Sequence, residues 1–219
     1  VCRLLLGKNL IGAFHQPHLV VVDPSLLATL QRREFRSGLY EVIKYGMIRS
    51  RTLFERVVSD RTAIFARQPA ALVPIISESC RIKAEVVGAD ERESGVRRIL
   101  NFGHTAGHAL EAATKYRRYR HGEAVAYGML VAAELAVRRQ ALDTADREAL
   151  VDVITALGPL PPIADVTVRQ MMDAMRHDKK VLAGRLHFVL PTAIGATAIV
   201  DDVSVKEMRQ ALINVGFSR

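Results

Sequence analysis

The sequence predicts a mainly α-helical protein with a short β element near its N-terminus and a β-hairpin near residues 187–200. Three observations support this class. Over several long segments apolar residues recur every three to five positions, the spacing of an amphipathic helix. Strand-like runs are short and few. The chain is 49% hydrophobic but only 5% aromatic and has no tryptophan, so we expect an aliphatic core packed between helices.

The first half of the chain divides at glycine, proline and serine residues. Residues 18–23 are rich in valine and end in Asp-Pro, which predicts a buried strand. The Asp-Pro-Ser that follows starts a short helical turn over 26–30. A Ser-Gly pair opens a helix over about 39–58, and a Gln-Pro pair starts another over about 70–88.

The second half contains the most apolar helix. Residues 104–114 form one expected helix, and 122–139 form the next. The helix over 122–139 is nearly apolar on all sides, which predicts a central core position. The remaining expected elements are helices over 144–157, 167–175 and 204–215, and β runs at 187–191 and 196–200 that turn at Gly195.

The charge of the chain narrows its partners. A formal net charge of +8 suits nucleic acid, a membrane surface or a phosphorylated substrate. Basic and aromatic residues alternate only at 115–120, a run typical of a solvated connector, so we expect no nucleic acid partner. No apolar run reaches the ~18 residues of a membrane span, so no membrane partner is expected either. Cys2 and Cys80 are too few for a disulfide framework, which indicates a reducing, cytoplasmic location.

Three of the seven histidines fall within 18 positions, at His104, His108 and His121. His104 and His108 are spaced i,i+4, so they share one face of a helix. Arg97 and Asn101 lie just upstream. Imidazoles, a guanidinium and an amide together suit a metal and an anionic, oxygen-rich small molecule. Because no glutamate follows His104, the segment does not match the H-E-x-x-H zinc-protease motif.

A metal held by imidazoles also needs a carboxylate from elsewhere in the chain. Glu41 is one candidate, but Glu41 and Lys44 could equally form an i,i+3 surface ion pair, and spacing does not decide between the two. His121 is expected at a helix N-terminus. There the helix dipole disfavours the imidazolium form and favours the neutral ring that a metal requires.

Six segments, taken in order, resemble the 3-dehydroquinate synthase family and span most of the chain. They are Gly7-Lys8-Asn9-Leu-Ile-Gly-Ala-Phe, Arg33-Glu34-Phe-Arg-Ser-Gly-Leu-Tyr-Glu41-Val-Ile-Lys44-Tyr-Gly, Lys83-Ala-Glu-Val-Val, Leu100-Asn101-Phe-Gly-His104-Thr-Ala-Gly-His108-Ala, His121-Gly-Glu-Ala-Val-Ala-Tyr-Gly-Met and Asp178-Lys179-Lys180. The resemblance implies a carbon–oxygen lyase of the shikimate pathway. Such an enzyme converts 3-deoxy-arabino-heptulosonate 7-phosphate to 3-dehydroquinate and phosphate, using NAD and a divalent metal, zinc or cobalt.

The resemblance also implies roles for individual residues. The implied metal ligands are Glu41, His104 and His121, which replaces the simple pairing of His104 with His108. The implied catalytic residues are His108, Lys83, Arg97 and Asn101. The implied substrate-binding residues are these four with Asn9, Lys179 and Lys180, and Lys44 and Glu93 line the same site. The implied nucleotide-binding residues are Lys8, Leu26, Thr29 and Leu30, with Glu34 nearby.

The resemblance further implies the domain organisation. Residues 1–30 are expected to be the end of a truncated, Rossmann-like NAD-binding domain, and residues 31–219 the helical metal- and substrate-binding domain of the dehydroquinate synthase-like fold. The chain has no glycine-rich phosphate loop, so its activity alone is an open question. The full-length protein is expected to be a homodimer. Two alternatives remain: a related sugar-phosphate cyclase of secondary metabolism, and a non-catalytic metal-binding remnant.

Overall fold

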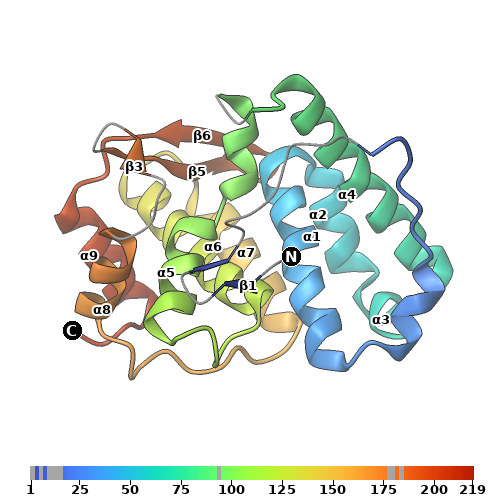
Figure 1. Cartoon of the computed structure of the whole chain (residues 1–219), viewed down its shortest axis with the longest axis horizontal. Coiled ribbons are helices and arrows are strands. Elements are labelled where there is room, and N and C mark those ends of the chain that lie inside the picture. The colour runs from blue at the N-terminus through green and yellow to red at the C-terminus, as the bar shows by residue number, and fades with distance from the viewer. Residues whose placement is uncertain (1–2, 5–6, 9–16, 93–94, 177–180, 183–184) are drawn as a thin grey trace.

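The computed structural model describes residues 3–4, 7–8, 17–92, 95–176, 181–182 and 185–219. Helices dominate these residues, as predicted (Figure 1). Helices α1 to α4 gather at one end of the molecule, and α5 to α9 gather with the β5–β6 hairpin at the other (Figure 1). Near the N-terminus, β1 (Arg3–Leu4) pairs antiparallel with β2 (Gly7–Lys8), a pairing that the sequence did not predict.

The strand predicted at residues 18–23 is wrong for this structure. Residues 18–23 have no regular secondary structure, and Leu19, Val20 and Val21 are 68–81% exposed. No described strand lies beside it to accept its backbone hydrogen bonds, and an unpaired strand is not stable. The helical turn that follows is confirmed as the 3-10 helix η1 (Pro24–Thr29), whose start is capped by the Asp23 carboxylate accepting from the Ser25 N–H.

The segment predicted as one helix over 39–58 contains two helices. The first, α1 (Arg32–Arg49), begins earlier than predicted, and the second is α2 (Arg51–Ser59). Ser50 separates them, because its backbone is extended and its hydroxyl accepts from the Leu53 N–H to cap α2. The Ser-Gly pair at 37–38 therefore lies inside α1 and does not start a helix. A short helix, α3 (Arg61–Phe65), follows, and the predicted helix over 70–88 is α4 (Pro69–Ala89).

Helix α6 (His121–Arg138) is the central helix, as its apolar sequence predicts. It packs against α1, α5, α7, α9 and strand β5, and 12 of its residues are buried. The other helices of this half are η2 (Val96–Asn101), α5 (His104–Ala113), α7 (Thr144–Ala156), α8 (Val168–Arg176) and α9 (Val205–Val215). Two short strands, β3 (Val181–Leu182) and β4 (Arg185–Leu186), pair antiparallel with each other.

Two glycines let α6 approach its neighbours at backbone distance. A Cβ atom at Gly128 would lie 1.7 Å from the carbonyl oxygen of Gly103, and one at Gly122 would lie 1.9 Å from that of Ser37. Either distance is far inside van der Waals contact. The first turn of α6 can therefore approach α1, and its middle can approach the start of α5, because neither glycine carries a side chain. This packing sets the position of His121 relative to His104.

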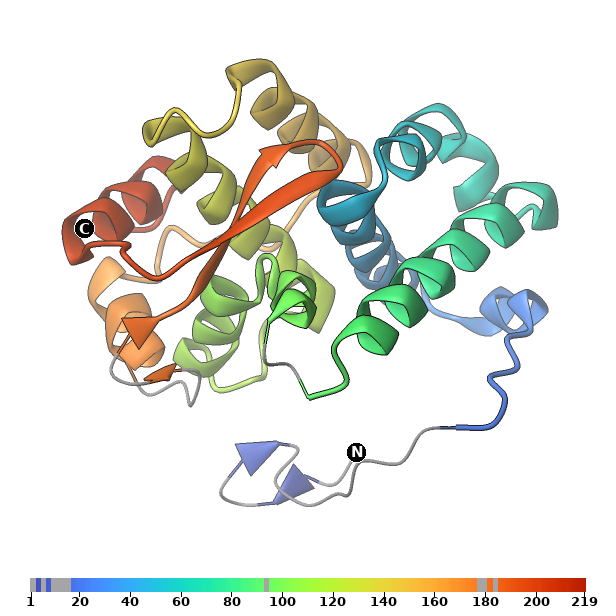
Figure 2. The same cartoon turned by 90° about the horizontal axis from the view of Figure 1, so that it is seen from above.

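The predicted hairpin is confirmed as β5 (Phe188–Ala193) paired antiparallel with β6 (Ala196–Val200). It crosses the helices in the view of Figure 2, with β5 against α6 and β6 against α1. Gly195 adopts φ +95° in the turn, a conformation that suits glycine, and its N–H donates to the Met47 carbonyl at 2.9 Å. The turn is thus hydrogen-bonded to the C-terminal part of α1.

Helix α9 is joined to the end of α6 by ion pairs around Arg139. Its guanidinium contacts Glu207 at 2.7 Å and Asp202 at 2.7 Å. Glu207 also completes a capping box with Ser204 at the start of α9. Hydrogen bonds from Arg139 and then Ser204 lower the pKa of Glu207 to about 2.

We expect Glu207→Gln to destabilise the protein in a pH-dependent way. Because the folded pKa lies below the unfolded value of about 4.3, the charge of Glu207 stabilises the fold above that pH, and this contribution is lost as pH falls toward 2. At pH 7 the variant should lose roughly 0.5–1 kcal/mol, the upper part of the range for a surface ion pair, because both side chains are partly covered. Urea unfolding at pH 7, 4 and 3 measures the difference. A gap that stays constant down to pH 3 would contradict the assignment.

Among the described residues, none of the helices combines the length and the apolar character needed to cross a bilayer.

Candidate metal and substrate site

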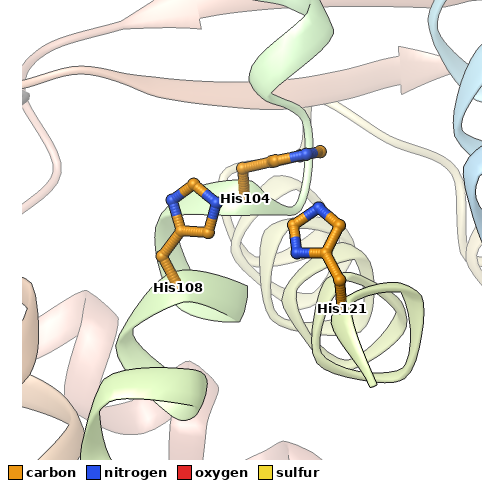
Figure 3. Close-up of side chains that lie close together, drawn as sticks. All are labelled: His104, His108 and His121. Carbon is orange, nitrogen blue, oxygen red and sulfur yellow. The ribbon is translucent and has the colours of Figure 1, made fainter. Parts of the chain in front are cut away.

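Three imidazole rings meet at the contact between α5 and α6. His104 and His108 lie one turn apart on α5, and His121 is the first residue of α6 (Figure 3). One ring nitrogen from each residue lies within 4.8 Å of the other two. The ring centroids are 5.2 Å apart for His104 and His121 and 5.3 Å apart for His104 and His108. All three rings are thus close enough to share one cation.

Glu41, from α1, reaches the same point. Its Oε1 atom lies 3.6 Å from Nε2 of His104 and 3.5 Å from Nε2 of His121. This oxygen is buried and has no hydrogen-bond partner among the described residues. The Nδ1 atoms of both histidines are engaged elsewhere, that of His104 with the Phe102 carbonyl at 3.1 Å and that of His121 with the Glu111 carboxylate at 3.2 Å. Two Nε2 atoms and one carboxylate oxygen therefore face each other.

Lys44 is the second partner of the Glu41 carboxylate. Its Nζ lies 2.7 Å from Oε2, and the lysine is 4% exposed. The i,i+3 ion pair considered from the sequence is therefore present, but it is partly buried and does not lie on the open surface. The two oxygens of Glu41 are divided between an ammonium and a pair of imidazoles, which leaves Oε1 for the shared point.

The surroundings of the site lower the pKa of one histidine and raise the pKa of another. Burial, helped by nearby Lys44, lowers the pKa of His104 to about 3, so this ring is neutral. The Glu111 carboxylate, hydrogen-bonded to Nδ1, and then the nearby Glu41 carboxylate raise the pKa of His121 to about 9. Burial acts to raise the pKa of Glu41, but His121, Lys44 and His104 outweigh it and hold that pKa below its usual range. A cation that binds Nε2 of His121 at neutral pH must therefore displace a proton.

The prediction that the helix dipole keeps His121 neutral is wrong for this structure. The dipole at the start of α6 does oppose a positive charge. Two carboxylates lie against the ring, however, and direct ion pairs at 3.2 and 3.5 Å outweigh a partial charge. The sequence did not reveal the second of them, Glu111, although its spacing of seven from His104 places it on the histidine face of α5.

Glu123 fixes the start of α6 and so the position of His121. Its carboxylate is fully buried, accepts from the Arg120 N–H and receives two bonds from Arg33 at 2.7 Å. The Gly122 N–H donates to the hydroxyl of Ser37. Both contacts tie the first turn of α6 to α1, the helix that also positions Glu41.

The other implied substrate residues are only partly described. Lys83 is exposed on α4, and Arg97 and Asn101 are half-buried on η2, which packs between α4 and α1. The Arg97 N–H donates to the Asp90 carboxylate at 3.1 Å. Four further implied residues lie outside the described ones: Asn9, Glu93, Lys179 and Lys180.

Three of the implied nucleotide-binding residues lie on or at the end of η1. Leu26 and Thr29 are on η1, Leu30 ends it, and Leu26 is 69% exposed. Arg67 donates hydrogen bonds to the carbonyls of Ala28 and Leu30 and so holds this turn in place. The backbone of Lys8 is in β2, and its side chain is outside the described atoms. Glu34 pairs with Arg120 on the neighbouring surface.

The residues present fit a divalent metal. Neutral imidazole nitrogen and carboxylate oxygen are the usual nitrogen and oxygen ligands of Zn²⁺. The buried Oε1 of Glu41 receives no hydrogen bond from the described residues to offset its desolvation, and a cation would satisfy it. Three protein ligands would leave one position open, the arrangement of catalytic zinc sites.

Comparison with known proteins points to one family. The family model described as 3-dehydroquinate synthase C-terminal matches residues 38–181, and the one described as 3-dehydroquinate synthase N-terminal matches residues 3–37. The 3-dehydroquinate synthase of Koribacter versatilis is 48% identical over 210 residues, covering 96% of this chain and 57% of the relative. That of Solibacter usitatus is 46% identical over 214 residues, covering 96% and 60%.

A solved structure supports the same fold. The 2-epi-5-epi-valiolone synthase of Streptomyces hygroscopicus, with NAD+ and Zn2+ bound, superposes with a TM-score of 0.86 at 30% identity, covering 95% of this chain and 58% of that one. This chain thus spans less than two thirds of the length of the proteins that it matches.

Proposed function

The chain belongs to the 3-dehydroquinate synthase family, and we propose that it is the metal- and substrate-binding portion of a 3-dehydroquinate synthase. The reaction is the conversion of 3-deoxy-arabino-heptulosonate 7-phosphate to 3-dehydroquinate with release of phosphate. It is a carbon–oxygen lyase reaction of aromatic amino-acid biosynthesis. The curated relatives, at 46–48% identity for the two described above, support this reading over the alternatives.

The observation that supports the proposal most is the convergence of Glu41, His104 and His121. Two Nε2 atoms lie 3.5–3.6 Å from one carboxylate oxygen that has no hydrogen-bond partner among the described residues. We propose that these three residues hold the divalent metal. When bound, such a metal supplies Lewis-acid polarisation of substrate oxygens. His108, on the next turn of α5, is then left to contact the substrate.

The substrate carries two anionic groups, a carboxylate and a phosphate, and the proposed residues around the metal are largely cationic. Lys83 and Arg97 would hold its carboxylate and phosphate, with Asn101 available for a hydroxyl. Lys44, which pairs with Glu41, would line the same site. Lysine and arginine are already positively charged at neutral pH, so they can bind an anion without a proton transfer. Their proposed role is to orient the sugar ring over the metal. Asn9, Lys179 and Lys180 belong to this proposed set by the resemblance.

NAD is the proposed redox cofactor, but only a few residues here would contact it. Leu26, Thr29 and Leu30 offer apolar surface and one hydroxyl, and the sequence has no glycine-rich loop for the pyrophosphate. We propose that residues 1–30 are the end of the NAD-binding domain and that 31–219 form the helical domain. Leu26, Thr29 and Leu30 would complete one wall of the nucleotide site.

A second candidate is a related sugar-phosphate cyclase, favoured by the close superposition on 2-epi-5-epi-valiolone synthase. The two candidates differ in the substrate, because a carboxylate requires an additional cationic partner that a sugar phosphate without a carboxylate does not. Presence of Arg97, Asn101 and His108 favours the dehydroquinate synthase reading.

The test joins zinc binding to turnover. We expect the 219-residue chain to bind Zn²⁺ but to release phosphate from the heptulosonate phosphate slowly with NAD present. A chimera that places the N-terminal portion of the Koribacter relative before this chain should release phosphate in an NAD- and zinc-dependent manner. It should not act on a sugar 7-phosphate that lacks the carboxylate. A folded, zinc-binding chimera with no phosphate release would support the non-catalytic alternative, and full activity of the 219 residues alone would contradict our account of the domains.

A further inference from the structure

We propose that Glu111 is a positioning residue that orients the His121 ring toward the metal. This inference rests on the proposed function, since it concerns the same metal site. Glu111 is outside the set implied by the family resemblance. The geometry that supports it is a carboxylate–histidine pair between α5 and α6, in which the carboxylate is buried and the ring is partly exposed.

The Glu111 carboxylate contacts one edge of the His121 ring, at Nδ1. Its Oε2 lies 3.2 Å from Nδ1 of His121, and Glu111 is 6% exposed. An ionised carboxylate can only accept, so Nδ1 must donate. The proton is thereby fixed on Nδ1, and Nε2 on the opposite side of the ring points at Oε1 of Glu41, 3.5 Å away.

His104 is oriented in the same way by a different group. Its Nδ1 lies 3.1 Å from the Phe102 carbonyl, and its Nε2 lies 3.6 Å from the same oxygen of Glu41. Both rings thus have Nδ1 engaged and Nε2 directed to one point. Ligating histidines usually donate their second N–H to a carboxylate or a backbone carbonyl, which fixes the tautomer and raises ligand basicity. The backbone performs this task for His104, and Glu111 performs it for His121.

The chain places Glu111 and His121 together through the end of α5. The backbone carbonyl of Glu111 accepts from the Tyr116 N–H at 2.7 Å, which closes the helix. Lys115 and Tyr116 then take left-handed conformations, with φ 56° at each, and the chain turns back. His121 therefore begins α6 directly beside the residue ten positions earlier. The tight turn and the carboxylate act together on one ring.

The experiment measures Zn²⁺ affinity by competition with a chromophoric chelator, in the 219-residue chain. Glu111→Leu removes the acceptor, and we expect it to weaken binding by roughly 10–100-fold, the usual effect of losing such a partner. Glu111→Gln keeps an acceptor oxygen but loses the charge, so its loss should be smaller, about 3–10-fold. The matched control is Glu134→Gln on the same helix pair, whose carboxylate contacts Arg147 and Asn214. It should bind zinc like the parent.

Melting temperatures without metal identify any variant that fails to fold. If Glu111→Leu does not fold, Glu111→Gln decides the question, with Co²⁺ absorption as a second readout. A rotated His121 ring changes the d–d bands of bound Co²⁺, whereas a purely structural role for Glu111 leaves them unchanged. Unchanged zinc affinity in a folded Glu111 variant would overturn this inference. Absence of zinc binding by the parent chain would instead overturn the proposed function.

Discussion

Replacing Gly128 with alanine is expected to unfold much of the protein and to abolish zinc binding. The new Cβ would lie 1.7 Å from the carbonyl oxygen of Gly103 and 2.8 Å from the Gly107 nitrogen, and all of these are backbone atoms that no side-chain rotation can relieve. Overpacking usually costs roughly 1–3 kcal/mol, and this backbone collision should exceed about 3 kcal/mol. The melting temperature should therefore fall by roughly 6–12 °C or more.

The effect on zinc follows from where the collision occurs. Gly103 directly precedes His104, and Gly107 directly precedes His108. To accommodate a methyl group, α5 must move away from α6, which separates both histidines from His121. Any Gly128→Ala protein that still folds should then show no zinc-induced rise in melting temperature.

Gly38→Ala is the matched control. Gly38 also lies inside a helix, but nothing lies within 4 Å of an added Cβ. Alanine should therefore stabilise α1 by about 0.5–1 kcal/mol through its higher helix propensity. Thermal unfolding followed by circular dichroism compares the two variants. Equal melting temperatures for them would contradict the close-packing account of α6.

The sequence was sufficient for features that depend on local spacing. The apolar character of residues 122–139 correctly predicts the central helix α6. The i,i+4 spacing of His104 and His108 correctly predicts one helical face. Gly195 between two β runs predicts the hairpin, and the positive φ at that residue is the physical reason. These features arise within one element, so a single sequence contains their cause.

Contacts between distant elements could not be derived from residue spacing, and only the family resemblance favoured Glu41 as a metal ligand over an ion-pair partner. The spacing of Glu41 and Lys44 is that of an ordinary ion pair, and only the packing of α1 on α6 brings Glu41 to the histidines. Glu111 went unnoticed because its role depends on the turn that places His121 beside it. The strand at 18–23 failed for the same reason: its valines predict burial, but burial requires a neighbouring sheet that the described residues do not contain.

Glu41→Gln is expected to weaken zinc binding by more than about 100-fold, because loss of an outer partner alone already costs roughly 10–100-fold. Glutamine keeps nearly the same shape and can still offer an oxygen to Lys44, so the fold should survive. It cannot offer a charged oxygen to the point that Nε2 of His104 and Nε2 of His121 face. Chelator competition measures the affinity. The shift in melting temperature at saturating zinc gives an independent value, since ligand stabilisation rises with the logarithm of the ratio of ligand concentration to Kd.

His108→Ala is the comparison that separates the two possible ligand sets. The three imidazoles alone could bind a cation, since their nitrogens lie within 4.8 Å of one another. If Glu41, His104 and His121 are the ligands, His108→Ala should change zinc affinity by less than about 10-fold, the low end of the effect of an outer partner. The reverse order, with Glu41→Gln nearly silent and His108→Ala severe, would assign the metal to three histidines. Glu41 would then act on the metal only through His104 and His121, and the buried Oε1 would need another explanation.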